Sequence, residues 1–232
     1  MLSAHRPRRR APAAPGRIGH VPRTRVRRLP ELQVAERAAL DTLLDEALVA
    51  HVGVVVDGHP LVVPTAFARD GDRLLVHGST GSGWMRAAGA GIPACVTVTA
   101  LDGLVVARSA FESSMRYRSA AVFGTLRALP SEERDRALEV LTDKLLPGRR
   151  CEVRPSSDQE ARQTLVLALP LETWSLKVSD GWPEDPDADL AGPAWAGVVP
   201  LRLTAGPPLP APDLRAGVAV PASVTRIVDR HP

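Results

Sequence analysis

Residues 49–79 read VAHVGVVVDGHPLVVPTAFARDGDRLLVHGS and indicate three consecutive antiparallel strands. Val-rich runs are interrupted at Asp57-Gly58 and at Asp70-Gly71, and Asp-Gly between apolar runs favours a hairpin because glycine accepts a positive φ. The expected strands cover about 49–56, 60–68 and 73–77. The stretch therefore predicts a β-meander rather than alternating strands and helices.

The segment before the meander, residues 31–48, has the periodicity of an amphipathic helix. Its apolar residues recur at helical spacing, and Glu, Arg and Asp occupy the opposite side. The apolar positions are Leu32, Ala35, Ala39, Leu40, Leu43, Leu44, Ala47 and Leu48. We expect this helix to pack against the sheet.

The segment after the meander predicts a short helix over about 83–90 and then three strands, within residues 94–100, 104–112 and 118–129. Residues Leu101-Asp102-Gly103 are expected to form the turn between the first two of them. A further helix begins at Ser131 and ends at Pro147-Gly148.

The last third of the chain predicts a short helix, a few more strands and irregular segments. Ser157 and Glu160 have the spacing of a capping box. Strands are expected within 164–171, 172–178 and 194–203, and an acidic loop over 179–193. Strands without βαβ alternation predict a mainly β fold, an antiparallel barrel with peripheral helices.

The charge of the chain is unevenly distributed. Residues 1–30 contain nine Arg and no acidic residue, whereas residues 31–232 contain 20 basic and 26 acidic side chains, a net charge of −6. We expect residues 1–23 to be a disordered basic extension or the product of an upstream start codon; contact with nucleic acid or a membrane surface is the alternative. The other expected units are a folded domain over 24–204 and a Pro-rich C-terminal surface segment over 205–232.

The composition favours a cytoplasmic protein with no membrane or specific nucleic-acid partner. No run of about 18 apolar residues could span a membrane, and no apolar segment follows the N-terminal arginines as in an export signal. Cys95 and Cys151 have neither metal-ligand nor disulfide-framework spacing. His51, His59 and His77 lie on different expected strands, and a structural role is favoured over a metal or haem site.

Two segments have the chemistry of a binding site. His77-Gly78-Ser79-Thr80-Gly81-Ser82 leaves a strand and enters the helix that contains Arg86, so backbone N–H groups, hydroxyls and a helix N-terminus could surround a phosphate monoester. A plain flexible turn is the competing interpretation.

The second segment is Ser114–Ser119, at the start of an expected strand. Tyr117 and Ser119 would share one face of that strand, where they could meet a ring system. Arg116 and Arg118 would share the other face, where an arginine could meet a phosphate. A solvated strand end is the alternative here.

Residues 52–82, followed by CVTVTALDGLVVARSAFESSMRYRSAAVFG (95–124), resemble the flavin-nucleotide-binding branch of the pyridoxamine 5'-phosphate oxidase-like superfamily, which includes nitroimidazole-resistance reductases. The resemblance covers about residues 24–204. It implies a six-stranded antiparallel split β-barrel, a homodimer, and FMN at the subunit interface.

The resemblance also implies roles for particular residues. Val63, Pro64 and Thr65 would present backbone groups to the flavin edge, and His77, Gly78, Ser79, Thr80, Gly81 and Ser82 would hold ribityl and phosphate. Arg118 and Ser119 match a pair near the cofactor in that superfamily. The basic pair that grips phosphate in true pyridoxamine-phosphate oxidases is replaced here by Gly83-Trp84, and their C-terminal Arg/His signature has no match. Such an oxidase activity is therefore not expected.

These features favour an FMN-dependent oxidoreductase that acts on a small oxidised compound. The flavin carries the chemistry in such proteins, so no catalytic acid or base is assigned. A non-catalytic flavin carrier or sensor, and a split barrel that binds haem or deazaflavin, are the alternatives.

Overall fold

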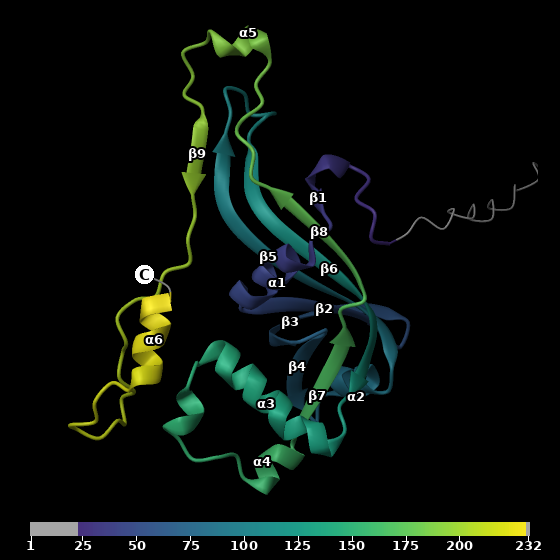
Figure 1. Cartoon of the computed structure of the whole chain (residues 1–232), viewed down its shortest axis with the longest axis vertical. Coiled ribbons are helices and arrows are strands. Elements are labelled where there is room, and N and C mark those ends of the chain that lie inside the picture. Colours follow the sequence, from purple (N-terminus) through teal and green to yellow (C-terminus); the bar gives the residue numbers. More distant parts are fainter. Residues whose placement is uncertain (1–22, 231–232) are drawn as a thin grey trace, which may run out of the picture.

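The computed structural model of the chain describes residues 23–230 (Figure 1). The expected extension over 1–23 therefore lies almost entirely outside the described residues. Within them the protein is mainly β, with helices at the periphery. The strands are β1 (Gln33–Val34), β2 (Val49–Val56), β3 (His59–Asp70), β4 (Arg73–Ser79), β5 (Ile92–Val106), β6 (Ser114–Ala128), β7 (Thr164–Pro170), β8 (Thr173–Ser179) and β9 (Gly197–Pro200).

Six short helical segments and two 3-10 turns complete the described part of the chain. They are α1 (Arg37–Glu46), α2 (Gly83–Gly89), α3 (Ser131–Leu145), α4 (Asp158–Arg162), α5 (Asp187–Leu190) and α6 (Ala222–Arg230), with 3-10 turns at Pro30–Leu32 and Arg149–Cys151. None of the helices among residues 23–230 is long and apolar enough to cross a membrane.

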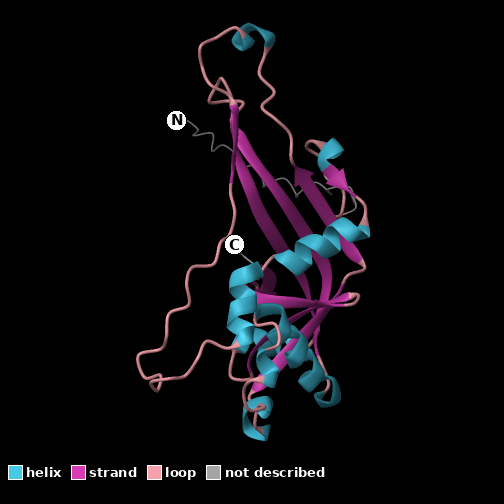
Figure 2. Ribbon diagram, turned by 60° about the vertical axis from the view of Figure 1, so that its left-hand side comes forward, coloured by secondary structure: helices cyan, strands magenta, loops and turns pink. Residues whose placement is uncertain are grey.

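The strands form one sheet in the order β1-β8-β6-β7-β4-β3-β2-β5-β9, and β5 also pairs with β6. Strands β6, β7, β4, β3, β2 and β5 therefore form a closed ring of six antiparallel neighbours. This ring confirms the mainly β, six-stranded fold expected from the sequence. Beyond the ring, β5 and β6 continue as a long ribbon with β8 and β9 at its edges (Figures 1 and 2).

The main core fills the ring and the space under α1. Leu40, Leu43 and Leu44 of α1 are fully buried, as are Phe67 of β3 and Val52 of β2. Of the apolar positions that the helical periodicity indicated, these three leucines are fully buried, whereas Ala35 is exposed. A smaller apolar cluster joins α3 to the outer side of β3, β4 and β7.

Both expected hairpins of the meander are confirmed. Asp57 and Gly58 adopt φ values of 51° and 77°, and Gly71 adopts 60°, so each turn uses the left-handed region that glycine tolerates. The capping box at Ser157 and Glu160 is also present.

The turn expected at Leu101-Asp102-Gly103 is wrong, because β5 passes through it as a single strand with a bulge. Residues 104–112 are accordingly not a separate strand. Gly103 serves another purpose: a Cβ there would lie 3.0 Å from the carbonyl oxygen of Val199. The glycine allows β9 to approach β5, and the chain reverses later, between Val106 and Ser114.

The helix expected over 31–48 is shorter than predicted. Only Arg37–Glu46 is α-helical, because Gln33 and Val34 pair with Lys177 and Leu176 of β8. Pairing with a strand far away in the sequence therefore outweighs the helical periodicity of these two residues.

The C-terminal region also differs from the expected surface segment. The chain from about 201 to 221 is exposed, but α6 packs against the body, where Ser223 is buried and its N–H donates to Glu152. In the same way the strand expected over 194–203 is reduced to the four residues of β9.

One face of the sheet has no helix over it. Along β2, β3, β5, β6 and β8 every second side chain enters the core, and the side chains in between point to this face. We call it the open face. Strand pairing and exposure assign to it Val49, His51, Gly53, Val55, Val62, Pro64, Cys95, Thr97, Thr99, Leu101, Leu104, Met115, Tyr117, Ser119, Ala121, Phe123 and Lys177. Residues 23–230 leave this face uncovered.

Candidate functional site

The loop between β4 and α2 is held in a defined shape by backbone bonds. Ser82 N–H donates to the Ser79 carbonyl at 2.9 Å, and Gly81 N–H donates to Ser79 Oγ at 3.1 Å. The Arg86 guanidinium donates to the Thr80 carbonyl oxygen at 2.8 Å and so stabilises the loop. The loop is therefore a hydrogen-bonded turn.

Several donors of this loop remain free to bind an anion. Ser79 uses its hydroxyl oxygen as an acceptor, so the hydroxyl proton is free to donate. Ser82 is the N-cap of α2, and its side chain makes no capping bond. The first N–H groups of a helix have no partner within the helix, so those of Gly83 and Trp84 also point outward. Phosphate binding by this loop stays a prediction.

His77 lies on β4 immediately before this loop. Its side chain is half-buried, and its Nδ1 atom is buried without a hydrogen-bond partner among the described residues. Burial lowers the pKa of His77 from its ordinary value of 6.5, so the ring is neutral at neutral pH. A buried ring nitrogen without a partner is a polar position that a ligand could satisfy.

The lowered pKa of His77 predicts a pH dependence of stability. The unfolded chain binds this proton more readily than the folded chain, so the contribution of His77 is complete above about pH 6.5 and decreases as the pH falls below it. We expect the melting temperature of the wild type to fall more between pH 6.5 and pH 5 than that of His77→Gln, which does not titrate. Thermal melts at half-unit intervals would measure this, and parallel curves for the two proteins would contradict it.

The edge of β3 near the loop is free of strand partners at the predicted flavin contacts. Strand β3 pairs with β2 along its first half, but with β4 only from Phe67 to Asp70. The other edge of Val63, Pro64 and Thr65 therefore presents backbone groups to no strand within the described residues. The contact of these backbone groups with a flat heterocycle stays a prediction.

Arg118 is not part of this cluster. Its guanidinium binds both carboxylate oxygens of Asp102, at 2.9 and 2.8 Å, and Glu46 of α1 at 2.5 Å. These hydrogen bonds raise the pKa of Arg118. Arg118 is thus occupied on the helix side of the sheet, and its predicted contact with the cofactor stays a prediction.

Tyr117 and Ser119 lie on the open face, as the strand alternation predicted. Ser119 stands between Thr99 of β5 and Lys177 of β8, and the Lys177 ammonium lies 6.0 Å from the centre of the Tyr117 ring. This pair is separated from the β3 edge by β2 and β5. At about 4.8 Å per strand, the distance along the sheet is roughly 14 Å. One copy of the chain therefore does not bring the two halves of the predicted site together.

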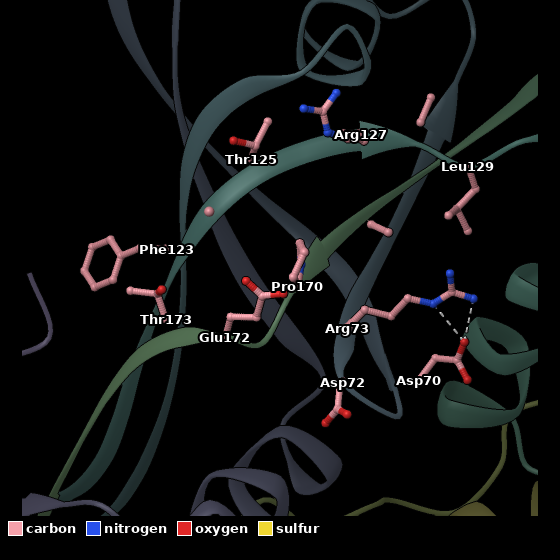
Figure 3. A pocket seen from close by; sticks show the side chains of 13 residues that line it. Asp70, Asp72, Arg73, Phe123, Thr125, Arg127, Leu129, Pro170, Glu172 and Thr173 are labelled. Carbon is pink, nitrogen blue, oxygen red and sulfur yellow. Dashed lines mark hydrogen bonds and ion pairs between the residues drawn. The ribbon is translucent and has the colours of Figure 1, made fainter.

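The structure also contains a cavity of about 820 Å³ that the sequence did not indicate (Figure 3). It lies where β6 leaves β8 after Phe123 and joins β7 at Arg127, so that residues 124–126 have no strand partner on that edge. Figure 3 shows Glu172 and Pro170 on one side and Arg73, bound to Asp70, on another. Only long-range strand pairing creates this gap, so no local sequence signal could have shown it.

The donor chemistry of this cavity limits what it can hold. Its lining contains no His, Cys, Met or Tyr side chain. It therefore lacks the side chains that bind haem iron. Likewise, residues 23–230 contain no group of three or more His, Cys, Asp or Glu side chains that could hold a metal ion.

A closed ring of six strands, an extended ribbon and a hydroxyl-rich loop at a strand end define the split-barrel class of nucleotide-cofactor proteins. The profile of the pyridoxamine 5'-phosphate oxidase family matches residues 36–178. The chain belongs to this flavin-binding, pyridoxamine-phosphate-oxidase-like family.

Two solved structures resemble the chain over most of its length. The FAD and heme binding protein from Mycobacterium smegmatis is 51% identical, with a TM-score of 0.83, and the match covers 85% of this chain and 97% of that one. The flavocytochrome Anf3 from Azotobacter vinelandii is 35% identical, with a TM-score of 0.83, covering 88% and 95%.

A more distant structure shares the fold. A nitroimidazole resistance-like protein from Bacteroides thetaiotaomicron is 23% identical, with a TM-score of 0.53, covering 63% of this chain and 86% of that one. No curated protein matched the sequence.

Proposed function

We propose that the protein is a redox flavoprotein that binds a flavin nucleotide beside the β4–α2 loop and passes electrons to a small oxidised compound. The observation that carries this proposal is the unpartnered Nδ1 atom of His77, near the end of β4 from which the Ser79–Ser82 loop leaves. The free edge of β3 over Val63–Thr65 would supply backbone contacts to the ring.

Each group of residues in the proposed site binds a different part of the flavin nucleotide. Hydroxyls of Ser79, Thr80 and Ser82, with the first N–H groups of α2, bind phosphate. Backbone groups of Val63–Thr65 pair with the polar edge of the ring, and the neutral imidazole of His77 donates or accepts one hydrogen bond. When bound, the flavin supplies the hydride or electron transfer. The protein contributes position and the exclusion of water.

The second half of the site comes from another copy of the chain. Two copies that pair through their open faces about a two-fold axis would place Tyr117 and Ser119 of one against the β3 edge of the other. The open face exposes Val62 by 62%, Val55 by 60% and Leu104 by 44%, an apolar surface of the kind that protein interfaces bury. The proposal is therefore a homodimer with two shared flavin sites.

The identity of the flavin is a separate question. The phosphate loop led us to expect FMN, whereas the M. smegmatis relative is described as binding FAD. The two are distinguished by releasing the cofactor from the purified protein with acid and separating it by chromatography before and after phosphodiesterase, which converts FAD to FMN. A colourless protein that takes up neither flavin would exclude the proposed function.

Turnover separates an enzyme from a carrier or sensor. A sample reduced with a nicotinamide cofactor should be reoxidised by quinones or nitro compounds many times per bound flavin. Reoxidation limited to one equivalent would favour a non-catalytic flavin carrier.

Haem is a second candidate cofactor, in addition to flavin. The M. smegmatis and A. vinelandii relatives are described by haem-protein terms, a heme binding protein and a flavocytochrome. The observation in this chain that favours haem is the exposed imidazole of His51 in the middle of the apolar open face.

The dimer proposal predicts the effect of a charge on the open face. Light scattering of the wild type should give about twice the 24.7 kDa chain mass. Leu104→Glu, at a position exposed by 44%, should shift the protein toward the monomer, because each copy would bury an unpaired carboxylate. Leu209→Glu, at a position exposed by 89% on the C-terminal segment, is the matched control and should stay dimeric. A wild-type monomer that binds flavin tightly would contradict the shared site.

A further inference from the structure

The first described residues, 23–28 (RTRVRR), form a basic segment that we call the arginine arm. Two hydrogen bonds of the Gln33 side chain fix it beside β1. Gln33 Oε1 accepts from the Val26 N–H at 2.9 Å, and Gln33 Nε2 donates to the Thr24 carbonyl oxygen at 3.0 Å. The arm therefore has a defined place at the β1–β8 edge of the sheet.

The guanidinium groups of the arm have no anionic partner. Exposure alternates along this segment, and the exposed side chains at alternate positions are Arg23, Arg25 and Arg27. None of the three forms an ion pair or a side-chain hydrogen bond with residues 23–230, and residues 1–22 contain no acidic side chain. Positive charges gathered in this way favour the binding of an anion.

The proposed phosphate site lacks a positive side chain of its own. Residues 78–85 contain no Lys or Arg. Arg86 donates to the Thr80 carbonyl oxygen within the loop, and Arg118 is bound by two carboxylates on the other side of the sheet. A phosphate monoester carries about two negative charges at neutral pH, and hydroxyls alone leave them without a counter-charge. The missing charge must come from outside the loop.

The arm lies next to the part of the open face that the proposed dimer brings to the other copy. Gln33 pairs with Lys177 of β8, and Lys177 pairs with Ser119 of β6, so about two strand spacings, roughly 10 Å, separate the arm from Ser119. Within one copy, four strand spacings, about 19 Å, separate β8 from β3. Because Tyr117 and Ser119 would face the β3 edge of the other copy, the arm would approach that copy too.

We propose that the arginine arm of each copy supplies the positive charge for the phosphate of the flavin nucleotide at the β4–α2 loop of the other copy. The inference rests on the proposed function. Arg25 and Arg27 would donate to the phosphate oxygens through their planar guanidinium groups. The arm also influences the open face, because the Arg23 charge offsets part of the rise that burial causes in the pKa of the Cys95 thiol.

The test titrates FMN and riboflavin into the full chain by flavin-fluorescence quenching. Arg25→Gln with Arg27→Gln should weaken FMN by about 10–100-fold, because two charge-assisted contacts with the phosphate are lost, and should leave riboflavin unchanged. Lys at both positions keeps the charges and should retain most of the FMN affinity. Arg202→Gln with Arg215→Gln, exposed on the C-terminal segment, is the matched control and should bind FMN like the wild type.

A mixed dimer identifies the copy whose loop the arm serves. One copy carries the two arm substitutions and the other carries Ser79→Ala with Ser82→Ala, and two different affinity tags isolate the mixed species. An arm that serves the other copy leaves one of the two sites with both elements intact, so half of the sites should bind FMN tightly. An arm that serves its own loop would leave both sites defective, and that result would contradict the proposal.

The remaining outcomes separate this inference from the proposed function. Wild-type FMN affinity in the arm variant would overturn the inference while flavin binding stands, whereas a wild type that binds no flavin would overturn both. A basic segment can also bind nucleic acid. Salt-dependent binding of duplex DNA that the arm substitutions abolish, with FMN affinity unchanged, would assign the arm to that partner and refute its role at the phosphate.

Discussion

Replacing Ser79 and Ser82 together with Ala is expected to weaken FMN binding by about two to four powers of ten. Each neutral donor to a charged oxygen contributes roughly 1.5–3 kcal/mol when its loss leaves the partner unpaired, and every 1.4 kcal/mol or so is tenfold in affinity. Because Gly83-Trp84 places no basic side chain directly after Ser82, we expect hydroxyls to carry more of the phosphate recognition. Riboflavin, which has no phosphate, should bind almost unchanged.

Flavin-fluorescence quenching measures both affinities for each variant. Ser79 Oγ also accepts from Gly81 N–H, so the double variant removes one bond of the loop itself. Ser79→Thr with Ser82→Thr keeps both hydroxyls and should retain FMN. Ser156→Ala, at an exposed position between α3 and α4, controls for loss of a surface hydroxyl. Equal losses of FMN and riboflavin would show that the loop does not hold phosphate.

Phe67→Ala should have the largest effect on stability. Phe67 is fully buried inside the ring, where it packs with the leucines of α1, and the Lys144 ammonium lies 5.6 Å from the centre of its ring. Removal of a core phenylalanine costs about 3–5 kcal/mol, since the cavity it leaves is only partly refilled. For a domain of this size, that corresponds to a fall in melting temperature of about 6–20 °C.

The matched control for this substitution is Phe111→Ala. Phe111 is exposed by 90% between β5 and β6, so its removal should change stability by no more than about 0.5 kcal/mol. Calorimetry or thermal circular dichroism would measure both variants. Similar melting temperatures for Phe67→Ala and the wild type would contradict the observed position of the core.

The elements that local chemistry controls could be predicted from the sequence. Asp57-Gly58 and Gly71 each require a left-handed backbone, and that requirement is satisfied within the turn itself. The capping box of α4 is equally local, since Ser157 and Glu160 satisfy each other. The Val-rich run over 49–56 forms a strand as expected, β2.

The predictions from the sequence were wrong where contact with a segment far away in the chain determines the local backbone conformation. The segment Leu101-Asp102-Gly103 has the composition of a turn. In the structure Gly103 lies within β5, and its lack of a side chain allows the Val199 carbonyl oxygen of β9 to approach closely. Gln33 and Val34 have helical periodicity but pair with β8, more than 140 positions away in the chain. The last helix, α6, is stabilised by Glu152 and by carbonyls of other elements, which residues 222–230 alone do not reveal.

The candidate site divides in the same way. The sequence by itself determined the Ser79–Ser82 turn, the position of His77 at its entrance, and the opposite faces of Tyr117 and Arg118, because these depend on strand alternation and on bonds between near neighbours. Only the tertiary structure decided that Arg118 is held by Asp102 and Glu46, that His77 Nδ1 lacks a partner, and that one face of the sheet remains uncovered. Charge pairing and burial depend on which segments meet across the fold, and that information is distributed over the whole chain rather than carried by any one motif.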